Sequence, residues 1–319
     1  MKRLFVVGNA VADVTFTVEQ SPRAGESVLA TAVQRAPGGK GLNQAVAAHR
    51  AGAAVVFHAT IGNDAEGAGI HERLEAEHMH GLRLVRCDVA TDMSVVTVSR
   101  GGENAIVTAA GCTRALEARE VVAQIADIAA GDTLLMQGNL SLDCTRALVG
   151  HARDAGATVI VNAAPWCWPD TSALQRCDGV IANEGEIRDI TGIDDPEQAA
   201  RRLLAQGPRW VVVTLGARGA LIVRDGHLVR LPAVAVVAVD TSGAGDVFCG
   251  VLVANLSQAA PFSYAIECAQ RAAALAVSRH GTFASIPAAD EMRHVMRTVS
   301  GEASGQDGMR MRAEDSSVA

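Results

Sequence analysis

Between about residue 130 and residue 225, short apolar runs alternate with stretches that have the periodicity of helices. The runs predict buried strands at Thr133–Met136, Thr158–Val161, Gly179–Ala182 and Trp210–Thr214. The periodic stretches predict helices at Leu142–Ala155, Glu184–Thr191 and Glu197–Gln206. Continuous apolar strands that alternate with helices are typical of a parallel sheet covered on both faces. In such sheets the crossovers are right-handed, and ligands bind beyond the carboxyl ends of the strands.

Two other stretches interrupt this rhythm and predict a second, smaller sheet. Val14–Val33 has the pattern of two paired strands, joined by a turn at Ser21-Pro22-Arg23-Ala24-Gly25. Met93–Ala109 has the pattern of a second pair, around Arg100-Gly101-Gly102-Glu103. Their loose alternation fits a sheet with one partly exposed face. Such a flap either covers a ligand or forms a dimer contact. The segment from Ser300 to Ala319 is polar and aperiodic, so we expect one domain over residues 1–299 and a disordered tail.

The composition excludes several classes of partner. The chain has 319 residues, a length that fits one large α/β domain or two small ones, and a formal net charge of −7. Nucleic acids and anionic membrane surfaces select clustered Lys and Arg, so we predict neither partner. Only Lys2 and Lys40 are lysines, and the remaining basic side chains are arginines.

The cysteines and the N-terminus favour a cytoplasmic location. The apolar strand Leu4–Val7 follows the first three residues, so we expect no signal peptide there, and no apolar run reaches the roughly 20 residues that span a bilayer. No histidine spacing matches a zinc site. The odd number of cysteines and the absence of a C-x-x-C pair favour free thiols in a reducing compartment. The cysteines are Cys87, Cys112, Cys144, Cys167, Cys177, Cys249 and Cys268.

One glycine-rich segment has the composition of an anion-binding loop. It is Asp240-Thr241-Ser242-Gly243-Ala244-Gly245-Asp246, between an apolar run predicted to be a strand, Val234–Val239, and an apolar helix. Small residues at 242–245 let a ligand approach the backbone, and they place free N–H groups at a helix N-terminus. A carboxylate beside a bound phosphate hinders simple binding, but it suits a base that takes a proton from an attacking hydroxyl. The alternative is that Asp246 caps the helix.

A second glycine-rich turn opens the helix Gln44–Ala51. Its sequence is Gly38-Gly39-Lys40-Gly41-Leu42-Asn43. It is not a P-loop, because the G-x-x-x-x-G-K-[ST] spacing is absent and Gly41 follows Lys40. Close backbone approach together with Lys40 and Asn43 suits hydrogen bonding to a polyol. The alternative is a tight turn that carries a surface lysine.

Two further segments lie where predicted strands end. Asn183-Glu184-Gly185-Glu186 begins a predicted helix, where its carboxylates either complement the helix dipole or organise the water shell of Mg²⁺. After the strand Trp210–Thr214, a tight loop either admits a flat base or is an ordinary turn. Its sequence is Thr214-Leu215-Gly216-Ala217-Arg218-Gly219.

Together these segments resemble the PfkB family of ribokinase-like sugar kinases. Gly38–Asn43 is similar to the N-terminal signature of the family, and Asp240–Asp246 is similar to its C-terminal signature. Asn183-x-x-Glu186 resembles the N-x-x-E magnesium motif, and Thr214–Gly219 resembles the nucleotide loop. The resemblance extends to about residue 297. Two signatures in the family's order and separation are highly specific, whereas either one alone is not.

The resemblance implies a three-layer α/β/α domain with a mainly parallel sheet, a β-sheet lid, and a homodimer formed through the lid. It implies ATP and Mg²⁺ as cofactors. It assigns Asp246 as the catalytic base, and the backbone of Gly243, Ala244 and Gly245 as the anion hole for the transferred phosphoryl group. The implied substrate contacts are Asp13, Gly39, Lys40, Asn43 and Asn139, beside Asp246. The implied nucleotide contacts are Asn183, Thr214, Gly216, Gly219 and Gly245, with Glu186 ordering Mg²⁺ through water.

The resemblance also implies a monovalent cation, K⁺, beside the anion hole. Its ligands, several of them backbone carbonyls, would be Asp240, Ser242, Ala276, Arg279, Gly281 and Ser285. Two positions depart from the ribokinases, the members closest in pattern. Val11 stands where they have a sugar-binding asparagine, and Asn139 where they have a glutamate near the sugar. A site built to bond a hydroxyl discriminates by roughly 10⁴–10⁵ in rate, so these departures leave the identity of the sugar open.

The predicted function is therefore ATP-dependent phosphorylation of a hydroxyl on ribose or another small carbohydrate. Asp13 and Asn43 would hold the substrate hydroxyls, and Lys40 would either help to hold them or approach the phosphate. Closure of the lid would expel water. One alternative is a nucleoside kinase of the same fold, for which Val11 and Asn139 leave room. A second is a sugar sensor without catalysis, against which Asp246 and its glycine loop argue. A third is a protein whose lid chiefly forms an interface.

Overall fold

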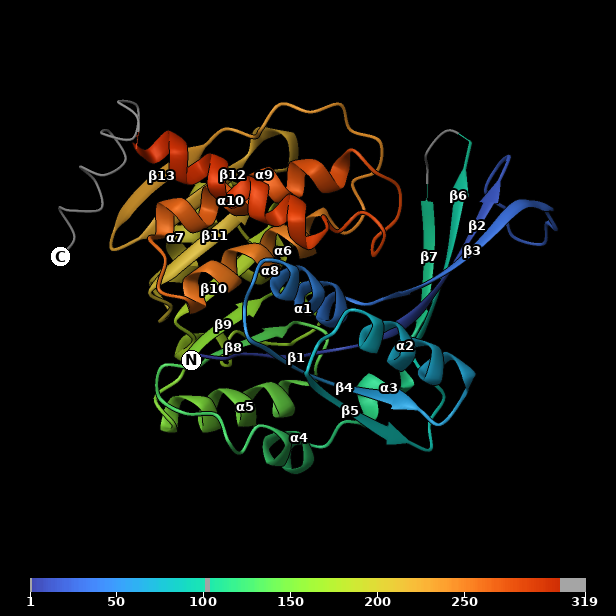
Figure 1. Ribbon diagram of the computed structural model, residues 1–319, viewed down its shortest axis with the longest axis horizontal. Coiled ribbons are helices and arrows are strands. Elements are labelled where there is room, and N and C mark those ends of the chain that lie inside the picture. The colour runs from blue at the N-terminus through green and yellow to red at the C-terminus, as the bar shows by residue number, and fades with distance from the viewer. Residues whose placement is uncertain (1, 101–103, 305–319) are drawn as a thin grey trace.

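The computed structural model describes residues 2–100 and 104–304 (Figure 1). Within them, a central sheet has the strand order β13-β12-β11-β10-β9-β8-β1-β4-β5. Neighbouring strands are parallel from β5 to β11, whereas β12 and β13 are antiparallel to their neighbours because short turns connect them. The strands are β1 (Leu4–Val7), β4 (Val55–Gly62), β5 (Gly81–Cys87), β8 (Thr133–Gln137), β9 (Thr158–Asn162), β10 (Gly179–Asn183), β11 (Trp210–Thr214), β12 (Ala220–Arg224) and β13 (His227–Leu231).

Helices cover both faces of this sheet, which confirms the predicted α/β architecture (Figure 1). Leu4 and Val6 face one apolar core together with α1, α2, α8, α9 and α10, while Phe5 and Val7 face a second core with α4, α5, α6 and α7. The helices are α1 (Lys40–Arg50), α2 (Ala65–Ala76), α3 (Gly111–Ala115), α4 (Ala118–Gln124), α5 (Leu142–Asp154), α6 (Glu184–Thr191), α7 (Pro196–Leu204), α8 (Ala244–Ser257), α9 (Phe262–Val277) and α10 (Ala289–Ser304), with 3₁₀ turns η1 (Leu174–Arg176) and η2 (Gly216–Arg218).

The smaller predicted sheet is also present, and we call it the lid sheet. Its order is β3-β2-β6-β7, with β2 parallel to β6 and the other pairs antiparallel. Its first half spans residues 11–38 and is longer than the predicted Val14–Val33. The predicted turn at Arg100–Glu103 lies mostly outside the described residues. The strands are β2 (Val11–Val18), β3 (Ala30–Gly38), β6 (Met93–Ser99) and β7 (Asn104–Ala109).

One sequence prediction was wrong. Val234–Val239 is irregular rather than a strand, because the chain leaves the sheet edge after β13, and the Val239 N–H bonds Val277 O on α9 at 2.7 Å. Val237 is 84% exposed, so this apolar run is not buried. Helix α10 continues to Ser304, so the first residues of the expected tail are helical, and residues 305–319 lie outside the described part. Among the helices of residues 2–100 and 104–304, none combines the length and the apolar composition of a membrane span.

Candidate active site

Asp246 lies in the first turn of α8, where that helix packs against α1. The side chain is 8% exposed. Gln44 donates a hydrogen bond from Nε2 to Asp246 Oδ1 at 2.8 Å, and Asn43 donates from Nδ2 to Oδ2 at 3.4 Å. The N-cap of α8 is Gly243, without a side-chain cap, so the Asp246 carboxylate does not cap its own helix. The two glycine-rich segments, about 200 residues apart in the chain, thus meet at this carboxylate.

The close approach of the two helices depends on a glycine. A Cβ atom at Gly250 on α8 would lie 2.5 Å from the Gln44 carbonyl oxygen of α1. Any larger residue would push the helices apart and separate Asp246 from its amide donors. The spacing of α8 and α1 therefore sets the geometry around the carboxylate.

A buried network of amides supports Gln44. Gln137 donates from Nε2 to Gln44 Oε1 at 2.9 Å, and Gln44 Nε2 also donates to Asn162 Oδ1 at 3.1 Å. Gln137 ends β8 and Asn162 ends β9, so both lie at the carboxyl edge of the sheet. These three residues were not predicted from the sequence. For Gln137 and Asn162 the available signal was a polar residue at the end of an otherwise apolar strand, whereas Gln44, on a helix, had none.

The loop before α8 presents backbone donors. Gly243 has φ of 75°, a left-handed conformation that favours glycine, and it turns the chain into the helix. Among the described residues, the N–H groups of Gly245 and Asp246 donate to no acceptor, and Ala244 N makes only a long contact of 3.4 Å with Thr241 O. Unpaired donors at a helix N-terminus attract anions. This arrangement fits the predicted anion hole.

Asp13 on β2 lines a cavity of about 290 Å³ between the lid sheet and α2. Thr282 Oγ1 donates to Asp13 Oδ2 at 3.3 Å. Burial raises the pKa of Asp13 to about 6, hydrogen bonds from Thr282 and Ser94 oppose this, and the negative charge of Asp246 adds to the rise. Gly38 lies against the carboxylate, because a Cβ there would be 2.0 Å from Oδ2. Asp246 is therefore close enough for its negative charge to act on Asp13.

Three buried side-chain oxygens, on α1 and at or after the end of β8, have no hydrogen-bond partner in the described protein. They are Asn43 Oδ1, Gln137 Oε1 and Asn139 Oδ1. An unsatisfied buried polar atom is unfavourable by about 1–3 kcal/mol. Hydroxyl groups of a polyol would satisfy them. Asn139 lies two residues after the end of β8, at the carboxyl edge of the central sheet.

Asn183 and Glu186 form a capping box at the start of α6. Asn183 Oδ1 accepts from the Glu186 N–H, and Glu186 Oε2 accepts from the Asn183 N–H, each at 2.8 Å. Burial raises the pKa of Glu186, although this N–H bond and the charge of Lys40 oppose the rise. Lys40, the first residue of α1, therefore acts electrostatically on Glu186. The Glu186 side chain thus caps α6, and the charges of Lys40 and Asp246 act on its carboxylate.

The predicted nucleotide loop begins where β11 ends. Gly216 begins the 3₁₀ turn η2 with open space beside it, and Gly219 has φ of 91°. A Cβ at Gly219 would lie 2.7 Å from Ala233 N, so the irregular segment after β13 packs against this loop. Exposed valines follow in that segment. They are Val234, Val236, Val237 and Val239.

Asp240 joins the two backbone segments predicted to hold a monovalent cation. Its Oδ1 accepts the Ser242 N–H at 2.8 Å and its Oδ2 accepts the Gly281 N–H at 2.9 Å. Burial alone would raise the pKa of Asp240, but these bonds lower it below its usual value. The side chain of Arg279 pairs with Glu291 at 2.5 Å, so only its backbone is available to an ion. In the described ranges, no group of three or more His, Cys, Asp or Glu side chains could hold a metal ion.

Comparison with known proteins identifies the family. Over residues 1–289 the chain matches the pfkB family carbohydrate kinases. The chain belongs to the PfkB family. It is 34% identical over 300 residues to the ribokinase of Haemophilus influenzae, covering 91% of this chain and 97% of that protein. It is 28% identical over 299 residues to the deoxyribokinase of Salmonella typhi, with 91% and 97% covered. The structure of Arabidopsis thaliana ribokinase complexed with ribose and ATP matches with a TM-score of 0.82 at 25% identity, covering 93% of this chain and 99% of that one.

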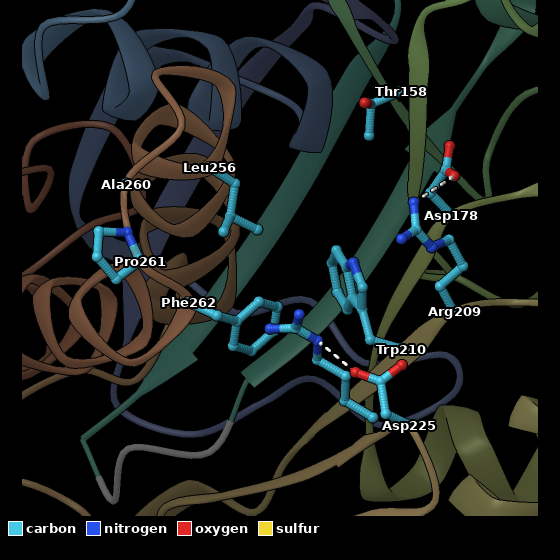
Figure 2. Close-up of a pocket in the computed structure, with 10 residues that line it drawn as sticks. Thr158, Asp178, Arg209, Trp210, Asp225, Leu256, Ala260, Pro261 and Phe262 are labelled. Carbon is cyan, nitrogen blue, oxygen red and sulfur yellow. Dashed lines mark ion pairs between the residues drawn. The ribbon is translucent and has the colours of Figure 1, made fainter. Parts of the chain in front are cut away.

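Membership of the PfkB family makes the chain a phosphotransferase with a hydroxyl acceptor, and it confirms the resemblance found in the sequence. A larger cavity, of about 490 Å³, lies at the opposite edge of the sheet from these candidate site residues. Figure 2 shows Trp210 and Phe262 in that cavity, with Arg209 paired to Asp178 at 4.0 Å. Thr158 and Trp210 begin their strands, so this cavity opens at the amino ends, away from every PfkB motif.

Proposed function

We propose that this PfkB kinase transfers the γ-phosphoryl group of ATP to a hydroxyl of a small sugar, with Asp246 as general base. The observation that carries the proposal is the placement of a buried carboxylate, held by Gln44 and Asn43, beside unpaired N–H groups at the N-terminus of α8. A base at that point takes the proton of the attacking hydroxyl while the amides stabilise charge on the transferred group.

The sugar binds between the lid sheet and the carboxyl edge of the central sheet. The Asp13 carboxylate and the unpaired oxygens of Asn43 and Asn139 accept hydrogen bonds from its hydroxyls. Lys40, whose charge acts on Glu186, lies on the side from which the phosphates arrive. Closure of the lid sheet over the cavity excludes water and limits hydrolysis of ATP.

ATP binds along the loops that follow β10 and β11. Asn183, Thr214, Gly216 and Gly219 lie at these loops, and the exposed valines after β13 offer an apolar surface to the base. Glu186 fits a magnesium ion held through water, because Mg²⁺ keeps most of its water shell and needs few protein ligands. Bound Mg²⁺ would neutralise charge on the phosphates.

A monovalent cation such as K⁺ fits between the 240–242 loop and the 276–285 segment. Asp240 holds these two segments together through the Ser242 and Gly281 N–H groups, and Ser285 Oγ donates to the Thr282 carbonyl at 3.1 Å. Carbonyls of Ala276 and Arg279 would complete the set of ligands. Such an ion would act by ordering the anion hole that follows Ser242.

The lid sheet also supports a homodimer. It exposes large apolar side chains that a second copy would cover. They are Leu29, Val33, Val95, Ile106 and Val107, and Leu29 is 92% exposed.

Formation of ADP across a panel of acceptors tests the proposal. The panel contains ribose and 2-deoxyribose, the acceptors named by the two relatives, together with hexoses and nucleosides, each with and without K⁺. We expect ADP release that depends on a sugar. A preference for nucleosides would reassign the acceptor, since Val11 replaces a polar sugar contact. Thermal stabilisation by a sugar without any ADP formation would contradict catalysis and favour a sensor.

A further inference from the structure

Cys87 and Cys112 lie just before and just after the β6–β7 half of the lid sheet. Cys87 is the last residue of β5 in the central sheet, and residues 88–92 then lead into β6. The chain returns from β7 through Ala110, and Cys112 is the second residue of α3. Figure 1 shows β6 and β7 extending from the corner where β5 and α3 lie.

The two sulfur atoms are in contact. Cys87 Sγ and Cys112 Sγ lie 3.1 Å apart, although 25 positions separate the residues in the chain. A disulfide bond measures about 2.05 Å, so the atoms need to approach by only about 1 Å. The other cysteines have no such contact with a second sulfur in the part of the chain that the structure describes.

Hydrogen bonds fix both crossing segments around this pair. Asp92, in the outgoing segment, accepts the Cys112 N–H at 2.8 Å and also bonds the Thr113 hydroxyl. Asp64 accepts the N–H of Thr91 at 2.8 Å and so ties the outgoing segment to the start of α2. The contact between the sulfurs is therefore held in place by the surrounding structure.

The two thiols differ in access. Cys87 is half-buried, whereas Cys112 is buried and its Sγ donates toward the carbonyls of Val89 and Ala90 at 3.3 and 3.2 Å. Burial, the neighbouring Cys87 and the charges of Asp92 and Asp64 raise the pKa of the Cys112 thiol to about 12. An oxidant from solution therefore meets Cys87 first, and Cys112 is placed as the resolving partner.

We propose that Cys87 and Cys112 form a reversible intramolecular disulfide when a hydroperoxide oxidises Cys87, and that this bond restrains the base of the lid sheet. The effect on catalysis rests on the proposed function, because it assumes that the lid sheet closes over a substrate. The bond itself does not depend on that assumption.

The chemistry has two steps. The Cys87 thiolate attacks the terminal peroxide oxygen, so an S–O bond forms, the O–O bond breaks, and the leaving oxygen takes a proton to become water or an alcohol. The Cys112 sulfur then attacks the sulfenic acid of Cys87, so the S–S bond forms, the S–O bond breaks, and the Cys112 proton leaves with the hydroxide as water. The two sulfurs together lose two electrons, and the hydroperoxide gains them. A thiol reductant reverses the bond by exchange.

The new bond would join the two connections between the β6–β7 half of the lid sheet and the main domain, and these connections must move if the lid sheet closes. Residues 88–92 and Ala110 are short connections, and Gly111 packs so closely that a Cβ there would lie 2.7 Å from Val89 Cγ1. Asp13 of β2 pairs in register with Ser94 of β6. A restraint at the base of β6 therefore reaches β2, the strand whose Asp13 carboxylate is proposed to bind the sugar. We expect oxidation to slow turnover several-fold.

The test uses the full chain with Cys167→Ser, which removes an exposed thiol that would react on its own. Reduced protein is treated with hydrogen peroxide, free thiols are alkylated under denaturing conditions, and the peptides are mapped by mass spectrometry. The expected result is one cross-linked peptide pair joining residues 87 and 112, which disappears after treatment with dithiothreitol. Oxidation of Cys87 without a cross-link, or cross-links between other cysteines, would overturn the proposal.

Two variants test whether changes in amide exchange and kcat require the disulfide bond. Cys112→Ser keeps a hydroxyl donor for the Val89 and Ala90 carbonyls, and Cys87→Ser removes the reactive thiol. With peroxide, the cross-linked protein should show slower amide exchange in residues 88–99 and lower kcat, both reversed by reductant, whereas neither variant should show the reversible change. A cross-link that alters neither exchange nor kcat would overturn the restraint of the lid. If the reduced protein phosphorylates no acceptor, the kinase proposal is contradicted instead. The disulfide proposal is still tested in that case, because peptide mapping and amide exchange do not require catalytic activity.

Discussion

Replacing Asp246 with asparagine tests the proposed role of this side chain as a base. The fold should tolerate the change, because Gln44 Nε2 donates to Oδ1, and an asparagine oxygen accepts the same bond. The second contact, from Asn43 Nδ2 at 3.4 Å, would then bring two NH₂ groups together. Asn43 can relieve this by rotating its amide by half a turn, since its Oδ1 has no partner in the described structure. The variant therefore loses the proposed base and its negative charge, while Asn43 turns its NH₂ group toward the site and donates to a sugar hydroxyl instead of accepting from one.

The expected loss is large and confined to turnover. A positioned base contributes about 10²–10⁴ in rate, which corresponds to about 3–5 kcal/mol of transition-state stabilisation. We expect kcat for ADP release at saturating sugar and ATP to fall by at least about two decades, whereas the sugar dissociation constant from calorimetry changes far less. Asp143→Asn, at an exposed position on α5, is the matched control and should keep full turnover. Near-normal kcat in Asp246→Asn would refute the assignment of the base.

Three further predictions concern the neighbouring groups. Burial raises the pKa of Asp13 to about 6, so below that pH its carboxylate is protonated, no longer accepts hydrogen bonds from sugar hydroxyls as an anion, and kcat/KM should fall. Asp13→Asn should lower kcat/KM and shift the acidic limb of its pH profile. An unchanged pH profile would count against this role of Asp13. Glu186→Gln preserves the cap on Asn183 but should raise the Mg²⁺ concentration needed for half-maximal rate by about 10- to 100-fold, while Glu184→Gln should not. Val107→Glu, at a 74% exposed position of the lid sheet, should raise a dimer dissociation constant at least about tenfold in sedimentation, unless the dimer forms elsewhere.

The strands β1, β8, β9, β10 and β11 of the central sheet were predictable because burial on both faces leaves a local signal, whereas β4, β5, β12 and β13 were not predicted. Strands such as Gly179–Asn183 and Trp210–Thr214 are flanked by neighbours and covered by helices, so each is a short apolar run between polar turns. The same signal misled at Val234–Val239, which is equally apolar but irregular, with Val237 84% exposed. An apolar run is typical of a segment that packs against other apolar groups, but it does not by itself predict a strand. In this chain Val234–Val239 lies outside the sheet, and its valines are exposed.

The parts of the candidate site that are formed by local backbone geometry were predictable from the sequence. The unpaired N–H groups after Gly243 follow from a glycine turn that opens a helix, and the capping box of Asn183 and Glu186 follows from their spacing. The amides of Gln44 and Asn162 were not predictable in this way. Their partners lie 202 and 118 positions away in the chain, and a buried glutamine has no sequence pattern of its own.

The choice of amides around Asp246 has a physical reason. An arginine or lysine paired with a carboxylate stabilises the ionised form, and a carboxylate so paired is a poorer proton acceptor. Gln44 and Asn43 instead orient the two Asp246 oxygens by hydrogen bonds from neutral amides, which bring no such charge into the site. Lys40 acts electrostatically on Glu186 and can meet the negative charge of the phosphates. This division of roles accounts for the buried amide network, which would otherwise be an unfavourable substitute for apolar packing between α1, β8 and β9.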